Sequence, residues 1–305
     1  MDIFSIILTL LGVQLVHGLT HHKQLPVVIW HGMGDTCCDN QTMGAIRQII
    51  ADELPNTYVH SVRVGSTEGA DRTAGFFGNV NTQLDSVCTD LLSIPELRGG
   101  VNLMGFSQGG LFARALVQRC SALKVQTLVT WGAPHSGVSQ IPSCAQHDTM
   151  CNWMRRVASR GVYSWYVRDH VVQAQYFKDP NRLDEYVERN VFLPDINGDS
   201  RDQPLEYRER IVALEKMVLV RFSNDSMICP AGSSWFGFVD ENGGEIGVED
   251  TRMYREDWLG LRELNESGRL ELVQVEGTHM QISERDLRSM VSKHFALRAP
   301  LLHVQ

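Results

Sequence analysis

The sequence predicts an α/β fold in which helices flank a mostly parallel central sheet. Short, continuous apolar runs recur along the chain, and such runs are typical of strands buried on both faces of a parallel sheet. Segments of roughly 10 to 15 residues with apolar side chains at helical spacing lie between them, which indicates βαβ units. The chain has 305 residues, of which 43% are hydrophobic, so a sizeable core can form.

The first strand is predicted over residues 26–30, where the sequence PVVIW is continuously apolar. A helix is predicted over 41–54, because its apolar residues recur at helical spacing and Pro55 ends it. The same patterns predict a second strand over 58–64 and a second helix over 80–92. These elements form two successive strand and helix pairs.

The central strands are predicted over residues 101–104 and 125–131, with a helix over 111–120 between them. The alternation stops after Gly132. Residues 134–215 contain many aromatic and charged residues and no continuous apolar run, which predicts an inserted, mainly helical cap. Within the cap, helices are predicted near 151–168 and 179–189.

The core pattern resumes with predicted strands over 216–222 and 269–275 and ends with a helix from 283 to about 295. No internal repeat or low-complexity linker interrupts the chain. We therefore predict one folded unit, in which residues 19–133 and 216–305 form the core and the cap is an insertion.

Charge and the N-terminal segment limit the class of protein. The balance of 28 basic against 36 acidic residues gives a net charge of −8, which disfavours a nucleic-acid partner and provides no polybasic patch for a membrane. Residues 1–18 contain an apolar run from Ile3 to Val16 and then small residues up to Gly18, which predicts a secretory signal peptide. The alternative is a retained helix or membrane anchor, but the run is shorter than the ~20 apolar residues that cross a bilayer. We expect no stable membrane span.

Cysteines and glycosylation motifs indicate the same secretory route. None of the cysteines has the spacing of a zinc site, and neither a metal nor a cofactor is predicted. In a secreted chain six cysteines could form three disulfides, with one left over. The cysteines are Cys37, Cys38, Cys88, Cys120, Cys144, Cys151 and Cys229. Candidate glycosylation sites, each in an Asn-X-Ser/Thr motif, are Asn40, Asn224 and Asn265.

A glycine-rich sequence joins a predicted strand to a predicted helix. The sequence GFSQG at 105–109 fits G-x-S-x-G, the nucleophile elbow of α/β-hydrolases. A tight strand-to-helix turn crowds the backbone, so the positions beside the serine must lack side chains. We therefore predict an α/β-hydrolase fold with Ser107 as nucleophile, above the carboxyl edge of the sheet and beside a helix N-terminus that favours negative charge. The alternative is a plain glycine-rich turn.

A serine hydroxyl is a poor nucleophile until a base takes its proton, and in this fold an acid and a histidine follow the serine along the chain. Asp225 directly follows a predicted strand and His279 follows the next one, after a glycine that permits a turn. We predict both as partners of Ser107, with the carboxylate orienting the imidazole. Rival candidates that do not follow a strand in this way are Asp240, Asp250, His294 and His303.

The loop after the first strand predicts an oxyanion hole. Its sequence HGMG at 31–34 resembles the loop that supplies one backbone N–H, while the residue after the nucleophile supplies the other. These donors would be Met33 and Gln108. Loss of one such donor typically costs about 3 kcal/mol of transition-state stabilisation. A glycine-rich turn without this role is the alternative.

Five sequence blocks, in this order along the chain, resemble the palmitoyl-protein thioesterases. The blocks are HGMGDTCC at 31–38, NLMGFSQGG at 102–110, RFSNDS at 221–226, WFGF at 235–238 and DWLGL at 257–261. They cover nearly the whole chain beyond the predicted signal peptide. Together they are far more specific than G-x-S-x-G alone.

The resemblance implies a lysosomal hydrolase that removes long fatty acyl chains from cysteine thioesters of proteins during their degradation. The family's triad falls on Ser107, Asp225 and His279, and its oxyanion donors fall on Met33 and Gln108, in agreement with the predictions from the residues themselves. The resemblance also implies three disulfides and one unpaired cysteine: Cys37–Cys38, Cys88–Cys120 and Cys144–Cys151, with Cys229 left over.

We therefore expect a serine hydrolase that removes palmitate from S-palmitoylated proteins or peptides and from acyl-CoA through an acyl-enzyme. No oligomeric state is predicted. A palmitoyl chain needs a long apolar groove, and the cap is the expected wall. Its candidate lining residues are Trp153, Tyr163, Trp165, Tyr166 and Phe177. Alternative functions are an oxygen-ester lipase or esterase with the same triad, and an inactive lipid carrier on a hydrolase scaffold.

Overall fold

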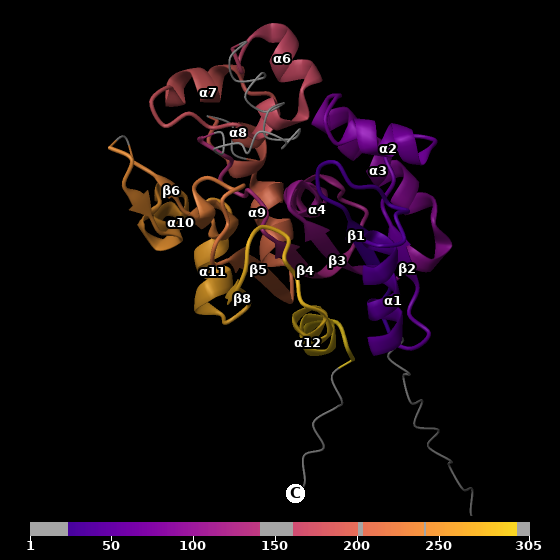
Figure 1. Ribbon diagram of the computed structural model, residues 1–305. Coiled ribbons are helices and arrows are strands. Elements are labelled where there is room, and N and C mark those ends of the chain that lie inside the picture. The colour runs from indigo at the N-terminus through magenta and orange to yellow at the C-terminus, as the bar shows by residue number, and fades with distance from the viewer. Residues whose placement is uncertain (1–23, 141–160, 201–203, 241, 298–305) are drawn as a thin grey trace, which may run out of the picture.

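A six-stranded parallel sheet forms the centre of the molecule (Figure 1). The computed structural model describes residues 24–140, 161–200, 204–240 and 242–297. The strand order is β2-β1-β3-β4-β5-β8, and every neighbouring pair is parallel, which confirms the predicted fold class. The strands are β1 (Val27–Trp30), β2 (Val59–Ser61), β3 (Val101–Phe106), β4 (Val125–Trp131), β5 (Lys216–Phe222) and β8 (Leu270–Val275).

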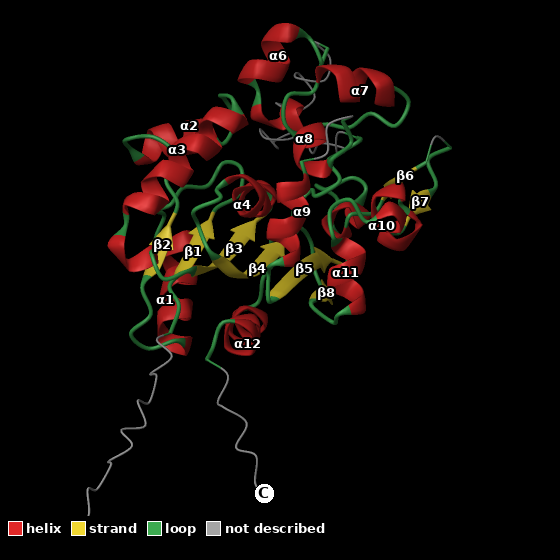
Figure 2. Cartoon of the chain, turned by 180° about the vertical axis from the view of Figure 1, so that it is seen from behind, coloured by secondary structure: helices red, strands yellow, loops and turns green. Residues whose placement is uncertain are grey.

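Helices cover both faces of this sheet (Figure 2). One face carries α1 (Met43–Glu53) and α12 (Glu284–His294). The other face carries α3 (Val80–Ser93), α4 (Gln108–Arg119), α9 (Leu205–Val212) and α11 (Leu261–Glu266). Because side chains alternate along a strand, β1 contributes to two cores, with Val27 and Ile29 on the α1 side and Val28 and Trp30 on the α4 side.

Local sequence explains where the helices begin. Asn79 precedes α3, and its side chain accepts hydrogen bonds from the backbone N–H of Asn81 and of Thr82. Ser283 precedes α12 and accepts from the backbone N–H of Asp286. Such caps satisfy N–H groups that have no partner within the helix, so each helix starts at a defined residue.

Short helices of the predicted insertion gather on the side of the molecule away from α1 and α12 (Figures 1 and 2). They are α6 (Trp165–His170), η2 (Val172–Tyr176), α7 (Leu183–Arg189) and α8 (Leu193–Asn197). The helix predicted near 179–189 corresponds to α7, and most of the one predicted near 151–168 lies outside the described residues. This segment contacts the chain after α2 at η2, where the backbone N–H of Val172 donates to the Phe76 carbonyl (3.0 Å).

The remaining elements are short. They are α2 (Glu68–Ala74), α10 (Arg252–Glu256), the antiparallel pair β6 (Phe238–Val239) and β7 (Glu245–Ile246), and the 3-10 turns η1 (Pro95–Leu97), η3 (Ala231–Trp235) and η4 (Val248–Asp250). None of them has the apolar periodicity on which the predictions depended, and none was predicted.

Among the boundaries that differ from those predicted, two have a clear structural reason. The edge strand β2 is shorter than 58–64, because it pairs only with β1, and that register covers Val59 to Ser61. The helix α4 begins at Gln108 rather than at Leu111. Its first turn therefore contains the two glycines that the pattern had placed in a loop.

Two of the three implied disulfides are present, Cys37–Cys38 and Cys88–Cys120. The second joins α3 to the residue that follows α4. Cys229 is a free thiol. Among the described residues, no helix is long and apolar enough to cross a bilayer. Cys144, Cys151 and the predicted signal peptide at 1–18 lie outside the described residues.

Candidate active site

Ser107 occupies a strained turn between β3 and α4. Its φ of 51° and ψ of −124° are rarely adopted by a residue with a side chain, so the turn must be held by its surroundings. The Ser107 N–H donates to the Trp131 carbonyl in β4 (2.7 Å), and its carbonyl accepts from the N–H of Gly110 (2.9 Å). This strand-to-helix turn has the geometry of a nucleophile elbow, which exposes the serine hydroxyl at the edge of the sheet.

Gly105 and Gly109 are required by close packing around this turn. A Cβ atom at Gly109 would lie 2.2 Å from the carbonyl oxygen of His31 and 2.4 Å from that of Trp30. A Cβ atom at Gly105 would lie 2.4 Å from the Cα of Gly110. Real Cβ atoms do not approach other heavy atoms so closely, so α4 can pack against β1 and β3 only if these positions have no side chain.

His279 connects the serine to a buried carboxylate. Its Nε2 lies 2.8 Å from Ser107 Oγ, and its Nδ1 lies 2.8 Å from Asp225 Oδ2. The other carboxylate oxygen of Asp225 accepts from the backbone N–H of Met227 (2.9 Å) and of Ile228 (3.0 Å). The structure thus brings together the three predicted triad residues, which follow β3, β5 and β8.

The hydrogen bonds define the role that each group can take. The Asp225 side chain has no exposed surface and its carboxylate can only accept, so His279 Nδ1–H is the donor to it. In that tautomer Nε2 is the acceptor for the Ser107 hydroxyl. The loop of His279 turns at Gly277, where φ is 127°. The Gly277 carbonyl accepts from the N–H of Asn224 (3.0 Å), so the loops that carry acid and base bind each other.

The loop after β1 lies directly against the nucleophile. A Cβ atom at Gly32 would lie 3.2 Å from Ser107 Cβ, and Met33 lines the same cavity as Ser107. Gln108 is the first residue of α4, and the N–H groups of a helix's first residues have no acceptor within that helix. Met33 and Gln108 are therefore neighbours of the nucleophile, and their role as oxyanion donors stays a prediction.

A buried ion pair supports this loop. His31 Nε2 lies 3.1 Å from Asp71 Oδ1, and Asp71 also accepts from the backbone N–H of Cys37 (2.8 Å) and of Val64 (2.7 Å). Burial disfavours the charged imidazole, but the hydrogen bond and charge of Asp71 outweigh it and raise the pKa of His31. Burial alone would raise the pKa of Asp71, and the contact with His31 reverses this and lowers it. Both ends of the loop, His31 and the Cys37–Cys38 disulfide, are therefore tied to one carboxylate.

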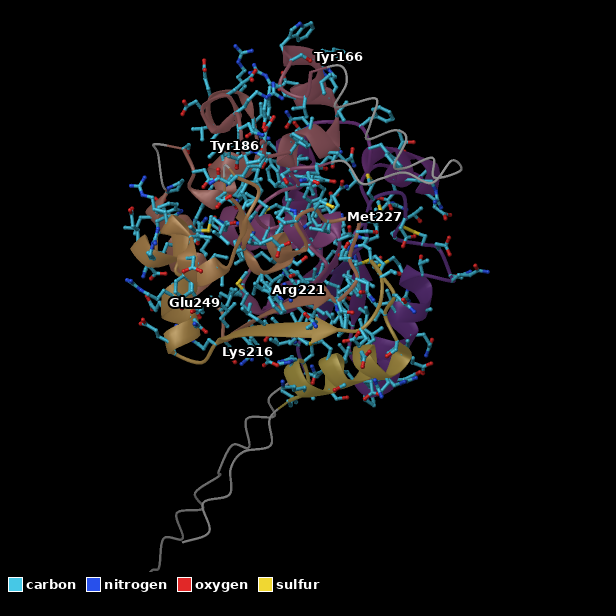
Figure 3. The ribbon with its side chains drawn as sticks, turned by 60° about the vertical axis from the view of Figure 1, so that its left-hand side comes forward. Tyr166, Tyr186, Lys216, Arg221, Met227 and Glu249 are labelled. Carbon is cyan, nitrogen blue, oxygen red and sulfur yellow. A yellow bond between two sulfur atoms is a disulfide. The ribbon has the colours of Figure 1, made fainter. Side chains whose placement is uncertain are left out.

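A cavity of about 560 Å³ opens beside Ser107 and His279. A large part of its apolar wall comes from α1, from the chain leading into α12 and from α12 itself: Met43, Ala45, Ile46, Ile49, Met280, Ile282 and Leu287. Further apolar residues come from the loop after β5 and from the inserted segment: Met227, Ile228, Val138 and Tyr176. β5 begins at Lys216, and Figure 3 shows Met227 beyond its other end. The triad residues follow the same, carboxyl, ends of their strands. Such a cavity suits an apolar chain attached to a group at the serine.

The expected aromatic lining from the cap is wrong for the four described residues. Tyr163 is buried, accepts from the Asp179 N–H (3.0 Å) and packs against the Phe177 ring. Trp165 and Tyr166 lie on the outer surface of α6, with 71% and 57% of their surface exposed, and Figure 3 shows Tyr166 at the periphery. The predicted Trp153 lies outside the described residues. Aromatic composition alone does not show which face of a short helix points toward a cavity.

Other predicted residues lie away from the triad. The rival candidates are in other elements, with Asp240 beside the β6 and β7 pair, Asp250 in η4 and His294 at the end of α12, while His303 lies outside the described residues. The side chains of Asn40, Asn224 and Asn265 are exposed, as glycosylation requires.

Two polar residues of η2 were not predicted and contact the site. Gln173 and Tyr176 are both buried, and each hydrogen-bonds the side chain of Gln108. A single glutamine and a single tyrosine in a segment without periodicity provide no signal that could have identified them from the sequence.

Several known proteins are similar to this chain in sequence over most of its length. A family model described as palmitoyl protein thioesterase matches residues 26–279, which include all three triad positions. Palmitoyl-protein thioesterase 1 of Caenorhabditis elegans is 40% identical over 97% of this chain and 100% of its own length. Palmitoyl-protein thioesterase 3 of Dictyostelium discoideum is 34% identical over 83% of this chain and 84% of its own.

A relative with a different name lies further away. The lysosomal thioesterase PPT2 homolog of Drosophila melanogaster is 30% identical over 81% of this chain and 83% of its own. The family match and the nearly full-length relatives confirm the predicted resemblance, and the parallel sheet with its elbow turn agrees with it. The chain is therefore a hydrolase of the α/β-hydrolase fold that belongs to the palmitoyl-protein thioesterase family.

Proposed function

We propose that this protein hydrolyses long-chain acyl thioesters, above all palmitoyl thioesters, of S-acylated proteins, S-acylated peptides and acyl-CoA. The observation that carries the proposal is a chain of two 2.8 Å hydrogen bonds, Ser107 to His279 to Asp225, beside an apolar cavity. The names of the relatives supply the substrate class, and the geometry supplies a means of attack.

The first step forms an acyl-enzyme. Ser107 Oγ attacks the thioester carbonyl carbon while its proton moves to His279 Nε2. Asp225 holds Nδ1–H and stabilises the imidazolium that results. The tetrahedral intermediate then collapses, the carbon–sulfur bond breaks, and the thiolate leaves with the proton that His279 returns.

The second step releases the fatty acid. A water molecule gives a proton to His279 Nε2 and attacks the ester carbonyl of the acyl-enzyme. Collapse of this second tetrahedral intermediate returns the proton to Ser107 Oγ and frees the carboxylic acid. In both steps the backbone N–H groups of Met33 and Gln108 donate to the oxyanion, which is where catalysis of this kind gains most of its electrostatic stabilisation.

The cavity beside Ser107 is the proposed acyl site. Each buried methylene contributes about 0.8 kcal/mol, so a continuous apolar wall favours long chains over short ones. In this proposal α1, α12 and the chain leading into α12 provide a large part of the wall, and the inserted segment contributes Pro134, Val138 and Tyr176.

We further propose that the chain enters the secretory pathway and works in the lysosome. The two disulfides support an oxidising route, and the relative in Drosophila is named as a lysosomal enzyme. The exposed asparagines Asn40, Asn224 and Asn265 permit glycosylation during that route. Expression in animal cells, with glycosidase digestion and lysosomal fractionation, tests this. A chain that stays unglycosylated in the cytosol would contradict it.

The function is tested by steady-state hydrolysis of palmitoyl-CoA and of an S-palmitoylated peptide, from acidic to neutral pH. We expect turnover by the wild type that continues on the acidic side, and loss of nearly all of it in a folded Ser107→Ala variant. A long-chain fluorophosphonate should label the wild type at Ser107 and leave the variant unlabelled.

The alternatives give different results in the same assays. A strong preference for a long-chain glyceride over palmitoyl-CoA would indicate an oxygen-ester lipase. Lipid binding without turnover or labelling of the folded wild type would indicate a carrier. Either result would overturn the proposed thioesterase activity.

A further inference from the structure

The inserted segment reaches the oxyanion hole through the 3-10 turn η2. Two of its side chains, Gln173 and Tyr176, are 4% and 5% exposed and point toward the start of α4 rather than toward solvent. Buried polar side chains are tolerated where they are hydrogen-bonded, so these contacts decide how η2 sits on the core.

The Gln108 side chain is held at both ends. Its Oε1 accepts from Gln173 Nε2 (2.8 Å) and from the Tyr176 hydroxyl (3.0 Å), while its Nε2 donates to the Gly75 carbonyl (3.1 Å). Burial raises the pKa of Tyr176, so its phenol stays protonated and remains a donor. Since Gln108 directly follows Ser107, restraint of its side chain also restrains the peptide N–H that faces the oxyanion.

Gln173 contacts the second oxyanion residue as well. Its Nε2 lies against Met33 Sδ and donates to the Gly75 carbonyl (2.8 Å). Gly75 packs on the same loop, because a Cβ atom there would lie 3.3 Å from Gly34 N and 3.7 Å from Met33 Cα. One amide group of the inserted segment therefore touches both residues whose backbones flank the nucleophile.

We propose that Gln173 and Tyr176 are positioning residues, which hold the Met33 and Gln108 backbones at the separation that the oxyanion requires. This inference rests on the proposed thioesterase function. Oxyanion donors act only when they are fixed in place before charge develops, within about 3 Å of the position that the oxyanion occupies. The contacts of Gln173 and Tyr176 provide that support from a segment outside the core.

The test compares three variants with a matched control. Gln173→Ala removes the amide, Gln173→Glu keeps its length but replaces the Nε2 donor, and Tyr176→Phe removes one hydroxyl. The control is Gln175→Ala. Gln175 is also buried in η2, but it bonds the Val80 N–H (2.8 Å) and the Gly78 carbonyl (2.7 Å), away from the oxyanion residues.

We expect both Gln173 variants to lower kcat for palmitoyl-CoA by about 10- to 100-fold, with KM changed by less than about threefold. Tyr176→Phe should lower kcat by a smaller factor. Gln175→Ala should lower the melting temperature and leave kcat close to that of the wild type. If η2 only packed against the core, the Gln173 and Gln175 variants would change stability and kcat in the same way.

Binding of a transition-state mimic provides a second readout. A long-chain trifluoromethyl ketone forms a tetrahedral oxyanion on the serine, so its inhibition constant should weaken by the same factor as kcat in the Gln173 variants. The affinity for palmitate, which forms no oxyanion adduct, should not change. If kcat and ketone affinity are unchanged in a folded Gln173→Glu or Tyr176→Phe variant, that residue has no positioning role.

The same experiment separates this inference from the proposed function. Wild type and Ser107→Ala are assayed beside the variants. Absence of Ser107-dependent turnover overturns the proposed function. Ser107-dependent turnover that is unchanged by both the Gln173 and the Tyr176 substitutions overturns the positioning inference alone.

Discussion

The position of the proposed acyl site predicts that Ala45→Phe shortens the preferred acyl chain. Ala45 is a small residue on the cavity side of α1, in the same apolar stripe as Ile46 and Ile49. A phenyl ring added there projects into the cavity without removing an existing side chain. The triad lies outside α1, so its hydrogen bonds should remain.

The magnitude follows from the methylenes that the ring displaces. It occupies the space of about four methylenes, each of which contributes about 0.8 kcal/mol when buried. Excluding them from the site therefore costs about 3 kcal/mol, or about 200-fold in kcat/KM. We expect a shorter lauroyl chain to end before the filled region and to lose little.

The assay measures kcat/KM for palmitoyl-CoA and lauroyl-CoA with wild type and variant. We expect the ratio of the two values to fall by up to about 200-fold in Ala45→Phe. The control is Gln48→Phe, which places the same ring on α1 at an exposed residue whose side chain bonds Asp52. An unchanged chain-length ratio in a folded Ala45→Phe variant would show that the acyl chain lies elsewhere.

Three further outcomes are expected. Asp225→Asn should lower kcat by about 10⁴-fold, because the amide favours the wrong imidazole tautomer, and a loss below tenfold in the steady-state assay would contradict that role. Because the pKa of His31 is raised in the folded protein, its charged form stabilises the fold below about pH 6.5, and this contribution is lost as the pH rises through the folded pKa. Because the pKa of Asp71 is lowered, its carboxylate stabilises the fold above about pH 3.9. The difference in free energy of unfolding between wild type and Asp71→Asn should therefore be larger near pH 5 than near pH 8. Urea titrations that give the same difference at both pH values would refute this. Replacement of both Cys88 and Cys120 by Ala opens a loop of 32 residues and should lower the free energy of unfolding by about 3 to 4 kcal/mol. Denaturation curves of wild type and variant that coincide would contradict this.

The parallel sheet could be predicted because its signal is local. The four residues of β1 are all buried and form an unbroken apolar run. β4 is buried over its last five residues, and its apolar side chains still mark it as a strand although two threonines lie among them. The predicted bounds of β4 and β5 agree with those observed. In the inserted segment, α6 and α8 are only six and five residues long, too short for helical periodicity to emerge from the sequence.

The positions of Ser107, Asp225 and His279 could be predicted for a topological reason. Each follows a strand, and the carboxyl ends of parallel strands meet at one edge of the sheet, so order along the chain was enough to group them. The residues of the cavity wall could not be predicted in this way. Periodicity shows that one side of α1 is apolar, but it does not show whether that side packs against a neighbour or faces an open space.

The contacts around the proposed oxyanion hole could least be predicted from the sequence, because each joins segments that are distant along the chain. Asp71 of α2 lies 40 residues from His31 along the chain and binds the loop after β1 through it. Gln173 of η2 lies 65 residues from Gln108 and binds the Gln108 side chain. The charges of the first pair depend on pH, whereas the second contact is between neutral groups. Acidification should therefore change the first support and leave the second unchanged, so the inserted segment can keep the Gln108 donor in place over the whole pH range in which the fold is stable.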